Sequence, residues 1–524
     1  MTKAADNNHY DIIIIGTGAG GGTLAHRLAP TGKRILILER GGFLPREKEN
    51  WDAREVYQKE RYHTQEQWYD SKGKPFRAQM SYWVGGNTKV YGAALLRLRE
   101  RDFEAVEHKD GISPAWPLKY EDFEPYYSQA EQLYDVHGQA GEDPTEPARS
   151  DDFPYPAVSH EPRMEEIANG LTQWGLKPFH LPLGLKLNEV DKTLGACIRC
   201  STCDGFPCLV QAKADADVNM IQPIRHEHNI TLMTEAKVTR LLTNDSGEQV
   251  TAVEVMVDGE HHTVSSEIVV VACGAINSAA LLLQSANDAH PTGLANSSNL
   301  VGRNLMKHIT TAMVALNTTP NPSVYQKTIA VTDFYWGEED FPYPMGLVQN
   351  TGTVTGDMMP AEAPELLAPL AKKVPSAGLQ KIADYATGWW LQTEDLPDPD
   401  NRVRVEQEQI HLDYTPNNVE AAKRLTDRWV KILKEIEKCE HVIPFGIYPR
   451  FMTPREVVGH QCGTCVFGED PEKSVLDLNC KTHDVDNLYV VDGAFFPSSS
   501  AVNPTLTIVA NALRVGDHIA KQLG

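Results

Sequence analysis

The sequence contains no hydrophobic run long enough to span a bilayer. Its longest uncharged apolar stretch, residues 268–283, is interrupted by Gly274 and Asn277 and is shorter than the roughly 20 residues that a spanning helix needs. No secretory signal is visible either, since residues 1–9 are polar and an apolar strand pattern follows them directly. We therefore expect a cytoplasmic protein that has no membrane partner.

Positive charge and cysteine are also scarce. The chain has 49 Lys and Arg against 71 Asp and Glu, a formal net charge of −22, which argues against nucleic acid or an anionic membrane surface as a partner. Nine cysteines in 524 residues are too few for a secreted disulfide scaffold. Repeats and low-complexity tracts are absent. What remains is an ordinary soluble composition, 41% hydrophobic and 23% charged, with room for two or three domains.

The start of the chain carries a βαβ pattern. Residues 12–15 and 35–38 both have the pattern of a buried strand, and a helical pattern lies between them. The first strand runs into three glycines with GxGxxG spacing, Gly16, Gly18 and Gly21, and the second strand ends at Glu39. This is the dinucleotide-binding fingerprint in its required context.

Each residue of this fingerprint has a physical task. Gly16 makes the tight turn, Gly18 allows the backbone to approach a pyrophosphate, and Gly21 allows the helix to pack closely on the sheet. The helix N-terminus offers free N–H groups to phosphate, and Glu39 can accept hydrogen bonds from a ribose diol. The alternative, a glycine-rich turn without a ligand, does not explain the paired strands and the acid. The fingerprint alone does not distinguish FAD from NAD.

The rest of the chain indicates a second, inserted unit. A strand pattern at residues 267–272 runs into Gly274 and a helix, so the cofactor domain returns late in the sequence. Short alternating segments between residues 310 and 414 predict an antiparallel sheet. We therefore expect an α/β protein with a discontinuous Rossmann-like cofactor-binding domain over residues 1–309 and 456–524. An antiparallel-sheet substrate-binding domain is expected over residues 310–455.

Several segments spread over the chain match the signatures of one family. They are Gly85-Gly86-Asn87-Thr88, Trp116-Pro117, Val301-Gly302-Arg303-Asn304-Leu305-Met306-Lys307-His308, His460-Gln461-Cys462-Gly463-Thr464, Asn487–Gly493 and Asn503-Pro504-Thr505-Leu506-Thr507. Over essentially its whole length the chain resembles the glucose-methanol-choline (GMC) flavin oxidoreductases. Within that family, the last segment and the Cys-rich stretch are most similar to the branch of pyranose oxidases and bacterial glycoside 3-oxidases. The resemblance implies the GMC fold and FAD as the cofactor.

The resemblance also implies a catalytic pair. His460 takes the place of the base that removes the hydroxyl proton, which suits an imidazole with an ordinary pKa of about 6.5. Asn503 takes the place of the second residue, whose amide donates a hydrogen bond to the substrate oxygen. Considered alone, His460 fits a structural histidine better, and Asn503 fits the N-cap of a helix that starts at Pro504. Because the segments that begin at His460 and at Asn503 both match the family signatures, the catalytic interpretation is favoured.

Further FAD contacts are implied outside the first fingerprint. They are Gly86, Asn87, Thr88, Val238, Ala272, Asp492, Gly493, Asn503 and Thr505. Some pyranose oxidases attach FAD covalently through a histidine that follows the double glycine. The corresponding stretch here, Asn87 to Tyr91, contains no histidine. We therefore expect FAD to be bound without a covalent link.

Polar residues of the second domain are candidates for the substrate wall. Asp333, Gln349, Gln392 and Glu394 lie on or beside its strand patterns, and Trp389 and Trp390 offer faces on which a sugar can stack. Taken singly, each polar residue is better explained as part of a solvated sheet face. The implied reaction is oxidation of a secondary ring hydroxyl, at C2 or C3 of a sugar or glycoside. His460 takes the proton, flavin N5 takes the hydride, and O₂ or a quinone-like acceptor takes the electrons.

Four clustered cysteines leave alternatives open. Cys197, Cys200, Cys203 and Cys208 have the spacing C-x2-C-x2-C-x4-C, which can hold an iron–sulfur cluster or zinc but differs from the bacterial ferredoxin pattern. Free thiols or a local disulfide are favoured, so no metal is expected. The alternatives are an iron–sulfur sugar dehydrogenase with a partner subunit, a lyase of the same fold that keeps its flavin, and a binding module with a relic flavin. The oligomeric state stays open.

Overall fold

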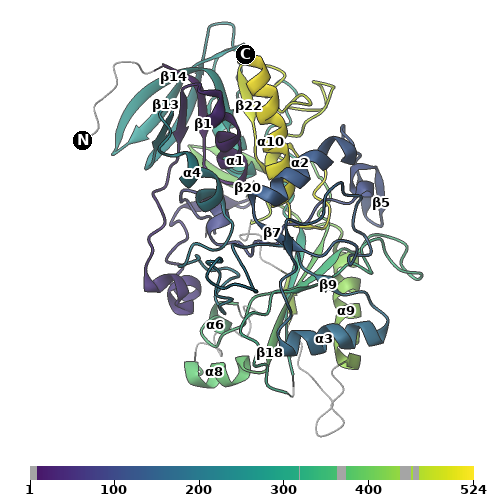
Figure 1. Ribbon diagram of the computed structural model, residues 1–524. Helices are drawn as coiled ribbons and strands as arrows, with labels where there is room; N and C mark the ends of the chain where they lie inside the picture. Colours follow the sequence, from purple (N-terminus) through teal and green to yellow (C-terminus); the bar gives the residue numbers. More distant parts are fainter. Residues whose placement is uncertain (1–8, 318, 363–372, 437–449, 453–458) are drawn as a thin grey trace.

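The computed structural model describes residues 9–317, 319–362, 373–436, 450–452 and 459–524. Two large sheets organise the chain, one in the upper part and one in the lower part of the view in Figure 1. In these ranges, no helix is both long and apolar enough to cross a membrane. The fold is α/β, as the sequence predicts.

The upper sheet is built around β1 (His9–Ile15). This strand pairs in parallel with β2 (Ile35–Leu38) on one side and with β14 (Glu260–Val271) on the other. β11 (Ile230–Met233) and β22 (Leu488–Val490) extend the sheet in parallel beyond them. The central strands are nearly continuous Ile, Leu and Val because both faces of a parallel sheet are covered.

β14 is longer than the sequence pattern indicates. The sequence pattern predicts a hairpin of residues 250–257 and 262–265 around Asp258-Gly259 and a separate buried strand from residue 267, but residues 260–271 form one strand of 12 residues. Its first part pairs antiparallel with β13 (Val250–Val257), which pairs in turn with β12 (Ala236–Thr243). The pattern over residues 229–242 predicts one strand, and the structure has two there, β11 and β12. They are separated by a turn at Glu235, whose φ is 54°.

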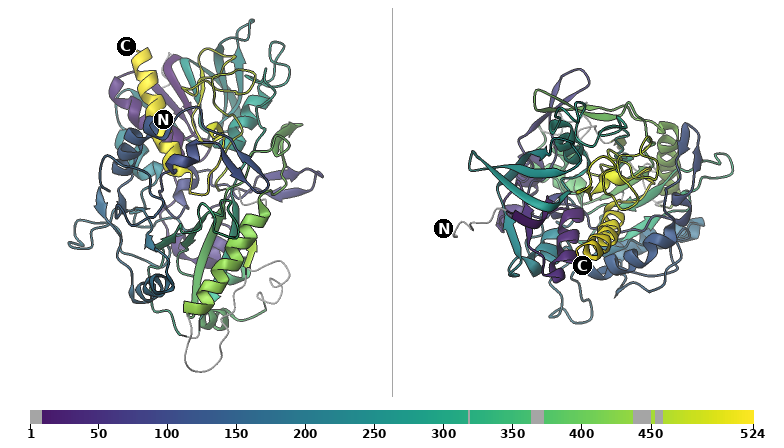
Figure 2. Two further views of the ribbon diagram at one scale, coloured as in Figure 1. Left: turned by 90° about the vertical axis from the view of Figure 1, so that its right-hand side faces the viewer. Right: turned by 90° about the horizontal axis from the view of Figure 1, so that it is seen from above.

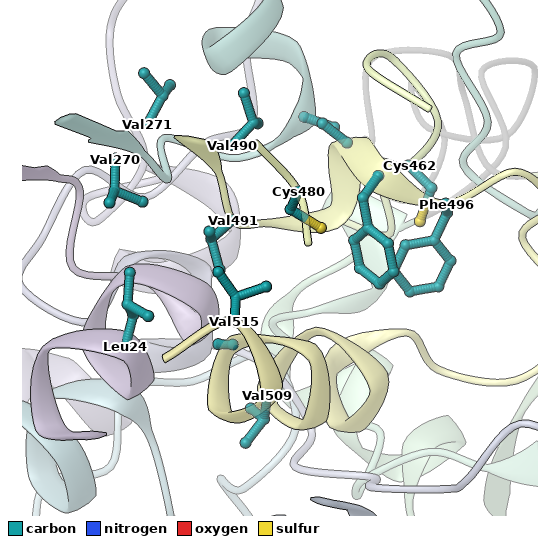
Figure 3. Packing of buried hydrophobic residues seen from close by; sticks show 14 of the residues in the cluster. Leu24, Val270, Val271, Cys462, Cys480, Val490, Val491, Phe496, Val509 and Val515 are labelled. Atoms are coloured by element: carbon teal, nitrogen blue, oxygen red, sulfur yellow. The ribbon is translucent and has the colours of Figure 1, made fainter. Parts of the chain in front are cut away.

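Helices with apolar faces pack in the core of this sheet. They are α1 (Ala19–Leu28), α2 (Tyr120–Leu133), α5 (Ala275–Gln284) and α10 (Thr505–Gln522). One of them, α2, packs on top of α10. Figure 3 shows how α1, β14 and α10 meet in the core, through Leu24, Val270, Val509 and Val515. The βαβ unit at the start of the chain and the later strand–glycine–helix unit, which the sequence predicts, are both confirmed.

The lower sheet is antiparallel. Its strands, in spatial order, are β21 (Arg450–Met452), β15 (Ile309–Leu316), β18 (Ala386–Thr393), β17 (Leu347–Asn350), β16 (Ile329–Val331) and β9 (Phe179–His180). α3 (Pro162–Trp174) and α9 (Val419–Ile436) pack in its core, and Figure 2 shows α9 lying along the sheet. The sequence pattern predicts a helix over residues 419–439, of which residues 437–439 lie outside the described residues.

The hydrophobic cores do not follow the predicted domain limits. α3, which precedes residue 310, packs in the lower core. β19 (Arg402–Glu406) and β20 (Gln409–Asp413), expected in the substrate sheet, form a separate sheet with β3 (Gln67–Asp70) and β4 (Pro75–Arg77) and contribute to the upper core. The division into residues 1–309 with 456–524 and residues 310–455 therefore stays a prediction. Its limit at residue 455 lies outside the described residues.

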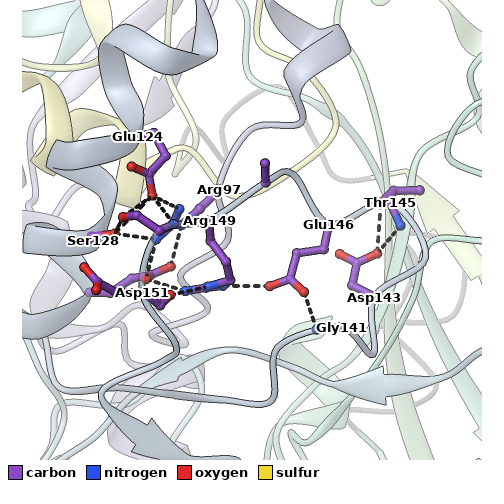
Figure 4. A network of polar contacts seen from close by, with 12 residues as sticks. Arg97, Glu124, Ser128, Gly141, Asp143, Thr145, Glu146, Arg149 and Asp151 are labelled. Carbon is purple, nitrogen blue, oxygen red and sulfur yellow. Dashed lines mark hydrogen bonds and ion pairs between the residues drawn. The ribbon is translucent and has the colours of Figure 1, made fainter.

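A buried polar network holds the acidic segment at residues 140–160, whose composition predicts an exposed connection. Arg97 donates to both carboxylate oxygens of Glu131, over 2.8 and 2.7 Å. Arg149 donates to Glu131 and to Glu146, each over 2.6 Å. Figure 4 shows Arg97, Arg149 and Glu146 in this network. The segment is therefore tied to α2 by paired charges.

Short elements complete the described chain. They are β5 (Val106–His108), β6 (Gly111–Ser113), β7 (Val136–Gly138), β8 (Tyr155–Pro156), β10 (Leu183–Gly184), α4 (Gln222–Ile224), α6 (Met359–Glu362) and α8 (Ser376–Ala383).

Candidate active site

A cavity of about 710 Å³ lies at the carboxyl ends of β1, β2 and β14 and is lined by residues of both large sheets. Its volume is in the range of cofactor and ligand sites. Most of the predicted site residues line it: Gly16, Gly18, Glu39, Gly86, Asn87, Thr88, Val238, Ala272, Gln349, Gln392, His460, Asp492, Gly493, Asn503 and Thr505. Three others, Gly21, Asp333 and Glu394, do not.

The three fingerprint glycines differ in what surrounds them. Gly16 has a φ of 102°, which a residue with a side chain rarely adopts, and it makes the turn after β1. A Cβ at Gly21 would collide with the carbonyl oxygen of Gly16, so this glycine allows α1 to pack against the strand. A Cβ at Gly18 would meet no atom of the chain within 4 Å. The space beside Gly18 is therefore left open on the cavity side.

Two buried carboxylates stand at the strand ends. Glu39 accepts hydrogen bonds from the Thr17 backbone N–H at 3.1 Å, from Thr17 Oγ1 at 2.5 Å and from the Gly41 N–H at 2.9 Å. Burial raises the pKa of the Glu39 carboxyl, while these donors oppose the shift. Asp492 accepts from the Gly274 N–H at 2.9 Å and from the Ala494 N–H at 2.8 Å. Asp492 thus joins the ends of β14 and β22.

A tight turn at Gly86–Lys89 forms another wall. Behind it, the Lys89 Nζ lies 3.1 Å from Asp215 Oδ2 and 2.9 Å from Asp217 Oδ2, and all three side chains are buried. Burial alone would lower the pKa of Lys89, but the two carboxylates raise it. Thr88 Oγ1 also accepts from the Ala216 N–H at 3.0 Å. These contacts fix the backbone of the turn against residues 215–217.

The cavity fits FAD. The open space at Gly18 and the N-terminal residues of α1 and α10, which line the cavity, suit a pyrophosphate. The carboxylate of Glu39 retains lone pairs for a ribose diol. Val238 and Ala272 line the same cavity and are available to an adenine ring. The residues present would therefore hold the ADP half of FAD between β1, β2 and the first turn of α1.

His460 also lines the cavity, and its ring contacts that of His308. The two Nδ1 atoms are 2.9 Å apart, and His308 Nε2 lies 3.2 Å from the carbonyl oxygen of Ser499. Because a carbonyl only accepts, His308 Nε2 carries a proton. Burial lowers the pKa of His308 to about 4, so its ring is neutral and its Nδ1 is an acceptor. The 2.9 Å contact then assigns the proton to His460 Nδ1, in preference to the tautomer whose Nδ1 would accept from Gln392 Nε2, 3.0 Å away, and the His460 Nε2 lone pair can accept a proton.

Three side-chain amides, those of Asn503, Gln349 and Gln392, form a chain of contacts beside His460. Asn503 Nδ2 lies 3.4 Å from His460 Nε2, and Asn503 Oδ1 accepts from Gln349 Nε2 at 3.0 Å. The same Gln349 nitrogen donates to Gln392 Oε1. Gln392 Nε2 in turn lies 3.0 Å from His460 Nδ1 and 3.4 Å from His308 Nδ1, beside the contact that joins the two rings. A closed ring of contacts thus orients the two predicted catalytic residues.

The surroundings keep His460 uncharged. Burial lowers its pKa well below 6.5, and neighbouring His308, Lys327 and Lys307 act in the same direction, while Asp204 opposes them. The imidazole is therefore neutral at neutral pH and can accept a proton. The N-cap position of α10, which begins at Thr505, is occupied by Pro504 and not by Asn503. The Asn503 amide is committed to the His460 side of the cavity.

Two predicted substrate residues lie elsewhere. Asp333 accepts the backbone N–H of Lys177 at 3.2 Å and stands outside the cavity. Glu394 accepts from Ser113 Oγ at 2.6 Å and from the Ser500 N–H at 3.3 Å, so its carboxylate is turned behind the Ser499–Ser500 loop. Residues two apart on one strand share a face, but Glu394 lies just beyond the end of β18 and does not follow Gln392 into the cavity.

Trp389 and Trp390 are neighbours on β18, and their side chains lie on opposite faces of the sheet. Trp390 lines the cavity, whereas Trp389 is buried in the lower core with its ring centroid 4.9 Å from that of Trp429. Alternation along β18 accounts for this, because successive side chains point to opposite faces. Of the two, Trp390 alone is available to a ligand.

Sequence reasoning missed several residues of the site. Lys307, Lys327 and Asp204 line the cavity, and His308 contacts His460. His308 belongs to the family segment at residues 301–308 and could have been found from it. Lys327 and Asp204 carry no local signal, since nothing near them in sequence marks a site.

The Cys-rich segment borders the cavity through Asp204. Cys200, Cys203 and Cys208 lie close enough to Cys197 for each to act on its pKa, which burial raises to about 12. All four are free thiols in the structure. In the described ranges, no group of three or more His, Cys, Asp or Glu side chains has an arrangement suited to a metal ion.

Comparison with known proteins adds to this geometry. Residues 10–310 and 394–512 match two family models, both described as GMC oxidoreductase. The chain is 30% identical to 6'''-hydroxyparomomycin C oxidase of Streptomyces lividus, over 98% of this chain and 92% of that protein. It is 29% identical to paromamine 6'-oxidase of Streptomyces fradiae, over 99% and 92%. The solved structure of pyridoxine 4-oxidase from Mesorbium loti is similar in fold, with a TM-score of 0.66 and 18% identity over 97% of this chain and 99% of that one.

The expected likeness to the pyranose oxidase branch covers little of the chain. Pyranose 2-oxidase of Tricholoma matsutake is 40% identical, but over 79 residues, which are 15% of this chain and 14% of that protein. The two aminoglycoside oxidases match almost the whole chain instead. The likeness to the family is thus general, and the specific branch expected from the sequence is not established.

Proposed function

Because the chain belongs to the GMC oxidoreductase family, whose members use FAD to oxidise CH–OH groups, we propose that its substrate is a sugar or glycoside. The observation that carries this proposal is the neutral His460 Nε2, which faces Asn503 Nδ2 in a cavity with many polar side chains and Trp390. The names of the long relatives support a sugar-like substrate. The position oxidised is a secondary ring hydroxyl, C2 or C3.

The chain's own residues supply proton transfer and positioning. FAD, when bound, supplies the acceptor for the hydride that leaves the carbinol carbon. His460 Nε2 takes the hydroxyl proton, and His308 holds His460 in the tautomer that makes this possible. Asn503 Nδ2 donates to the substrate oxygen as negative charge develops on it. Gln349 and Gln392 keep that amide oriented.

A second candidate is oxidation of an exocyclic hydroxyl. The two long relatives are named for oxidation at a 6' or 6''' position, and position 6 of a hexose unit is its exocyclic carbon. The two candidates give different products, since a ring hydroxyl yields a ketone and a primary exocyclic hydroxyl yields an aldehyde. Product analysis by NMR after turnover of methyl glucoside separates them.

The test of the proposal is an anaerobic screen for loss of the flavin's visible absorbance. Monosaccharides, O-glycosides and C-glycosides are added to the oxidised holoenzyme, with simple alcohols alongside. Reduction by sugars and not by simple alcohols supports the proposal, and no reduction by any sugar or glycoside overturns it. Reduction also excludes a lyase or a binding module with a relic flavin. His460→Ala should abolish reduction while retaining FAD.

The electron acceptor and the cysteines need separate measurements. Peroxide production under air distinguishes O₂ from a quinone-like acceptor. Iron and sulfide analysis of the purified protein tests the alternative of an iron–sulfur dehydrogenase with a partner subunit. Iron bound in stoichiometric amount to the protein would favour the iron–sulfur dehydrogenase over the oxidase.

We propose further that FAD is held without a covalent link. The turn Gly86–Lys89 presents Gly86, Asn87 and Thr88 to the cavity, and it offers no histidine, tyrosine or cysteine for attachment. Acid precipitation should release all of the flavin into the supernatant. Flavin that stays with the precipitated protein would contradict the proposal.

A further inference from the structure

One wall of the cavity carries an ion pair that the proposed proton transfer does not use. The Lys327 Nζ lies 2.7 Å from Asp204 Oδ2, and both residues line the cavity. The side chains are 4% and 16% exposed, so the pair is largely withdrawn from solvent. Asp204 comes from the Cys-rich segment and Lys327 from the loop before β16. Two distant segments therefore meet here.

The pair is held rigidly from the protein side. Asp204 Oδ2 also accepts the Gly352 N–H at 3.2 Å, and the Asp204 carbonyl accepts from Tyr57 Oη at 3.1 Å. A Cβ at Gly92 would collide with both Asp204 Oδ1 and Lys327 Nζ, so the pair packs directly on the backbone that follows the Gly86–Lys89 turn. It has little freedom to separate and adapt.

The Asp204–Lys327 pair keeps hydrogen-bonding groups that no other residue uses in the described part of the chain. Within the described residues, both contacts of the carboxylate go to Oδ2, so Asp204 Oδ1 has no donor. An ammonium group has three N–H donors, and that of Lys327 uses one of them on Asp204. An acceptor and a donor thus stand side by side in the wall of the cavity.

The charge state and position of the pair are also defined. Burial alone would raise the pKa of Asp204, but Lys327 and the Gly352 N–H hold it below its usual range. The carboxylate is therefore ionised and the pair as a whole is neutral. Lys327 and Asp204 line the same cavity as His460, and both act on the pKa of this base.

We propose that Asp204 and Lys327 form a specificity site that binds two neighbouring hydroxyls of a neutral polyol ring. One hydroxyl donates to Asp204 Oδ1, and its neighbour accepts from Lys327 Nζ. A carboxylate on the substrate would compete with Asp204 for Lys327, and an ammonium would compete with Lys327 for Asp204. Either would leave one member of a buried pair without its partner, which is costly.

This inference rests on the proposed function and names its substrate more narrowly. A site built to bond a hydroxyl rejects an analogue that lacks it, because buried polar groups of the protein are then left unpaired. Simple alcohols and deoxy sugars should therefore be poor substrates. The pair would set this preference without touching the reacting oxygen.

The experiment combines a deoxy series with two variants. The probes are methyl β-D-glucopyranoside and its 2-, 3-, 4- and 6-deoxy analogues, and the measured quantity is kcat/KM for anaerobic flavin reduction. In the parent enzyme, removing a hydroxyl that contacts the pair should cost roughly 10- to 100-fold. In Asp204→Asn and Lys327→Met, the parent glycoside should slow by a similar factor, and the same deoxy analogues should lose no further rate. Glu420→Gln, in the exposed pair with Arg424, is the matched control.

A binding measurement complements the kinetics. Calorimetric titration of methyl β-D-glucopyranoside into the His460→Ala holoenzyme should show weaker binding when Asp204→Asn is added. If a single variant does not hold FAD, the neutral double variant Asp204→Asn with Lys327→Gln replaces it.

The outcomes separate the two proposals. No reduction by any sugar or glycoside overturns the proposed function and this substrate class together. Reduction that both variants slow equally for the glycoside and every deoxy analogue, or do not slow at all, overturns only the assignment to Asp204 and Lys327.

Discussion

His308 Nδ1 and His460 Nδ1 are 2.9 Å apart, with their ring planes inclined at 82°. Only one of these nitrogens can carry the proton between them, and the Ser499 carbonyl, 3.2 Å from His308 Nε2, favours a proton on His460 Nδ1. A histidine that does not line the cavity thereby sets which nitrogen of the base is available.

His308→Phe removes the acceptor for the His460 Nδ1–H. We expect anaerobic flavin reduction to slow by roughly 100-fold or more, because the base loses its fixed tautomer. His308→Asn, whose Oδ1 can take the place of Nδ1, should recover much of the rate. Stopped-flow reduction of both variants, with FAD content checked by absorbance, measures this. Equal rates in the two variants would show that His308 has only a packing role.

The pH dependence of flavin reduction follows from His460. Since burial lowers its pKa well below 6.5, the neutral base is present at and above pH 6.5 and is lost only as the pH falls through the lowered value. The rate should therefore be level above pH 6.5 and decline at lower pH. Asn503→Asp places a carboxylate beside His460 Nε2, which raises the pKa of His460 and should move the decline to higher pH. A decline that stays in place would contradict this assignment.

Two glycines of the first turn should respond differently to alanine. Gly18→Ala adds a Cβ where no chain atom lies within 4 Å, so apoprotein stability should be unchanged while FAD binding weakens by roughly tenfold or more. Gly21→Ala drives a Cβ into the Gly16 carbonyl and should destabilise even the apoprotein by about 1–3 kcal/mol. Urea unfolding of the apoproteins and fluorescence titration with FAD distinguish the two.

Lys89→Met leaves Asp215 and Asp217 buried without their cation. Breaking such a pair should cost about 3–5 kcal/mol of unfolding free energy, measured by urea denaturation of the holoenzyme. Adding Asp217→Asn should restore part of the loss, because it removes one of the stranded charges. If the double variant were less stable than Lys89→Met, the cluster would not be the cause.

Much of this site can be predicted from the sequence. The βαβ unit is a local pattern, because strand, glycines and helix follow one another within the chain, and Gly16, Gly18 and Glu39 line the cavity. His460 and Asn503 cannot be found in this way and depend on resemblance to a family. The structure brings them together through the turn before β15, where His308 has a φ of 66°, and the loop before α10.

The remainder depends on which way individual side chains turn. Gln349 and Gln392, expected to bind substrate, line the cavity and contact each other, and Gln349 also contacts Asn503. Glu394 is turned toward Ser113, and Trp389 toward Trp429. A one-residue change of position on a strand reverses the face, and the ends of strands are the least certain part of any pattern. Asp204 and Lys327 are far apart in sequence, and only the tertiary fold brings them together in the cavity wall.

The contact between Asp492 and Gly274 joins residues 218 apart in sequence. During synthesis, at about 5–20 residues per second, β14 and its glycine turn wait roughly 10–40 s before β22 and this carboxylate leave the ribosome. Until then the side of β14 that will receive β22 is open to pairing with other strands. His460 and Asn503 emerge in the same late interval, so an incomplete chain has neither a finished cofactor sheet nor a base. Oxidation by this enzyme can begin only after that last strand is in place.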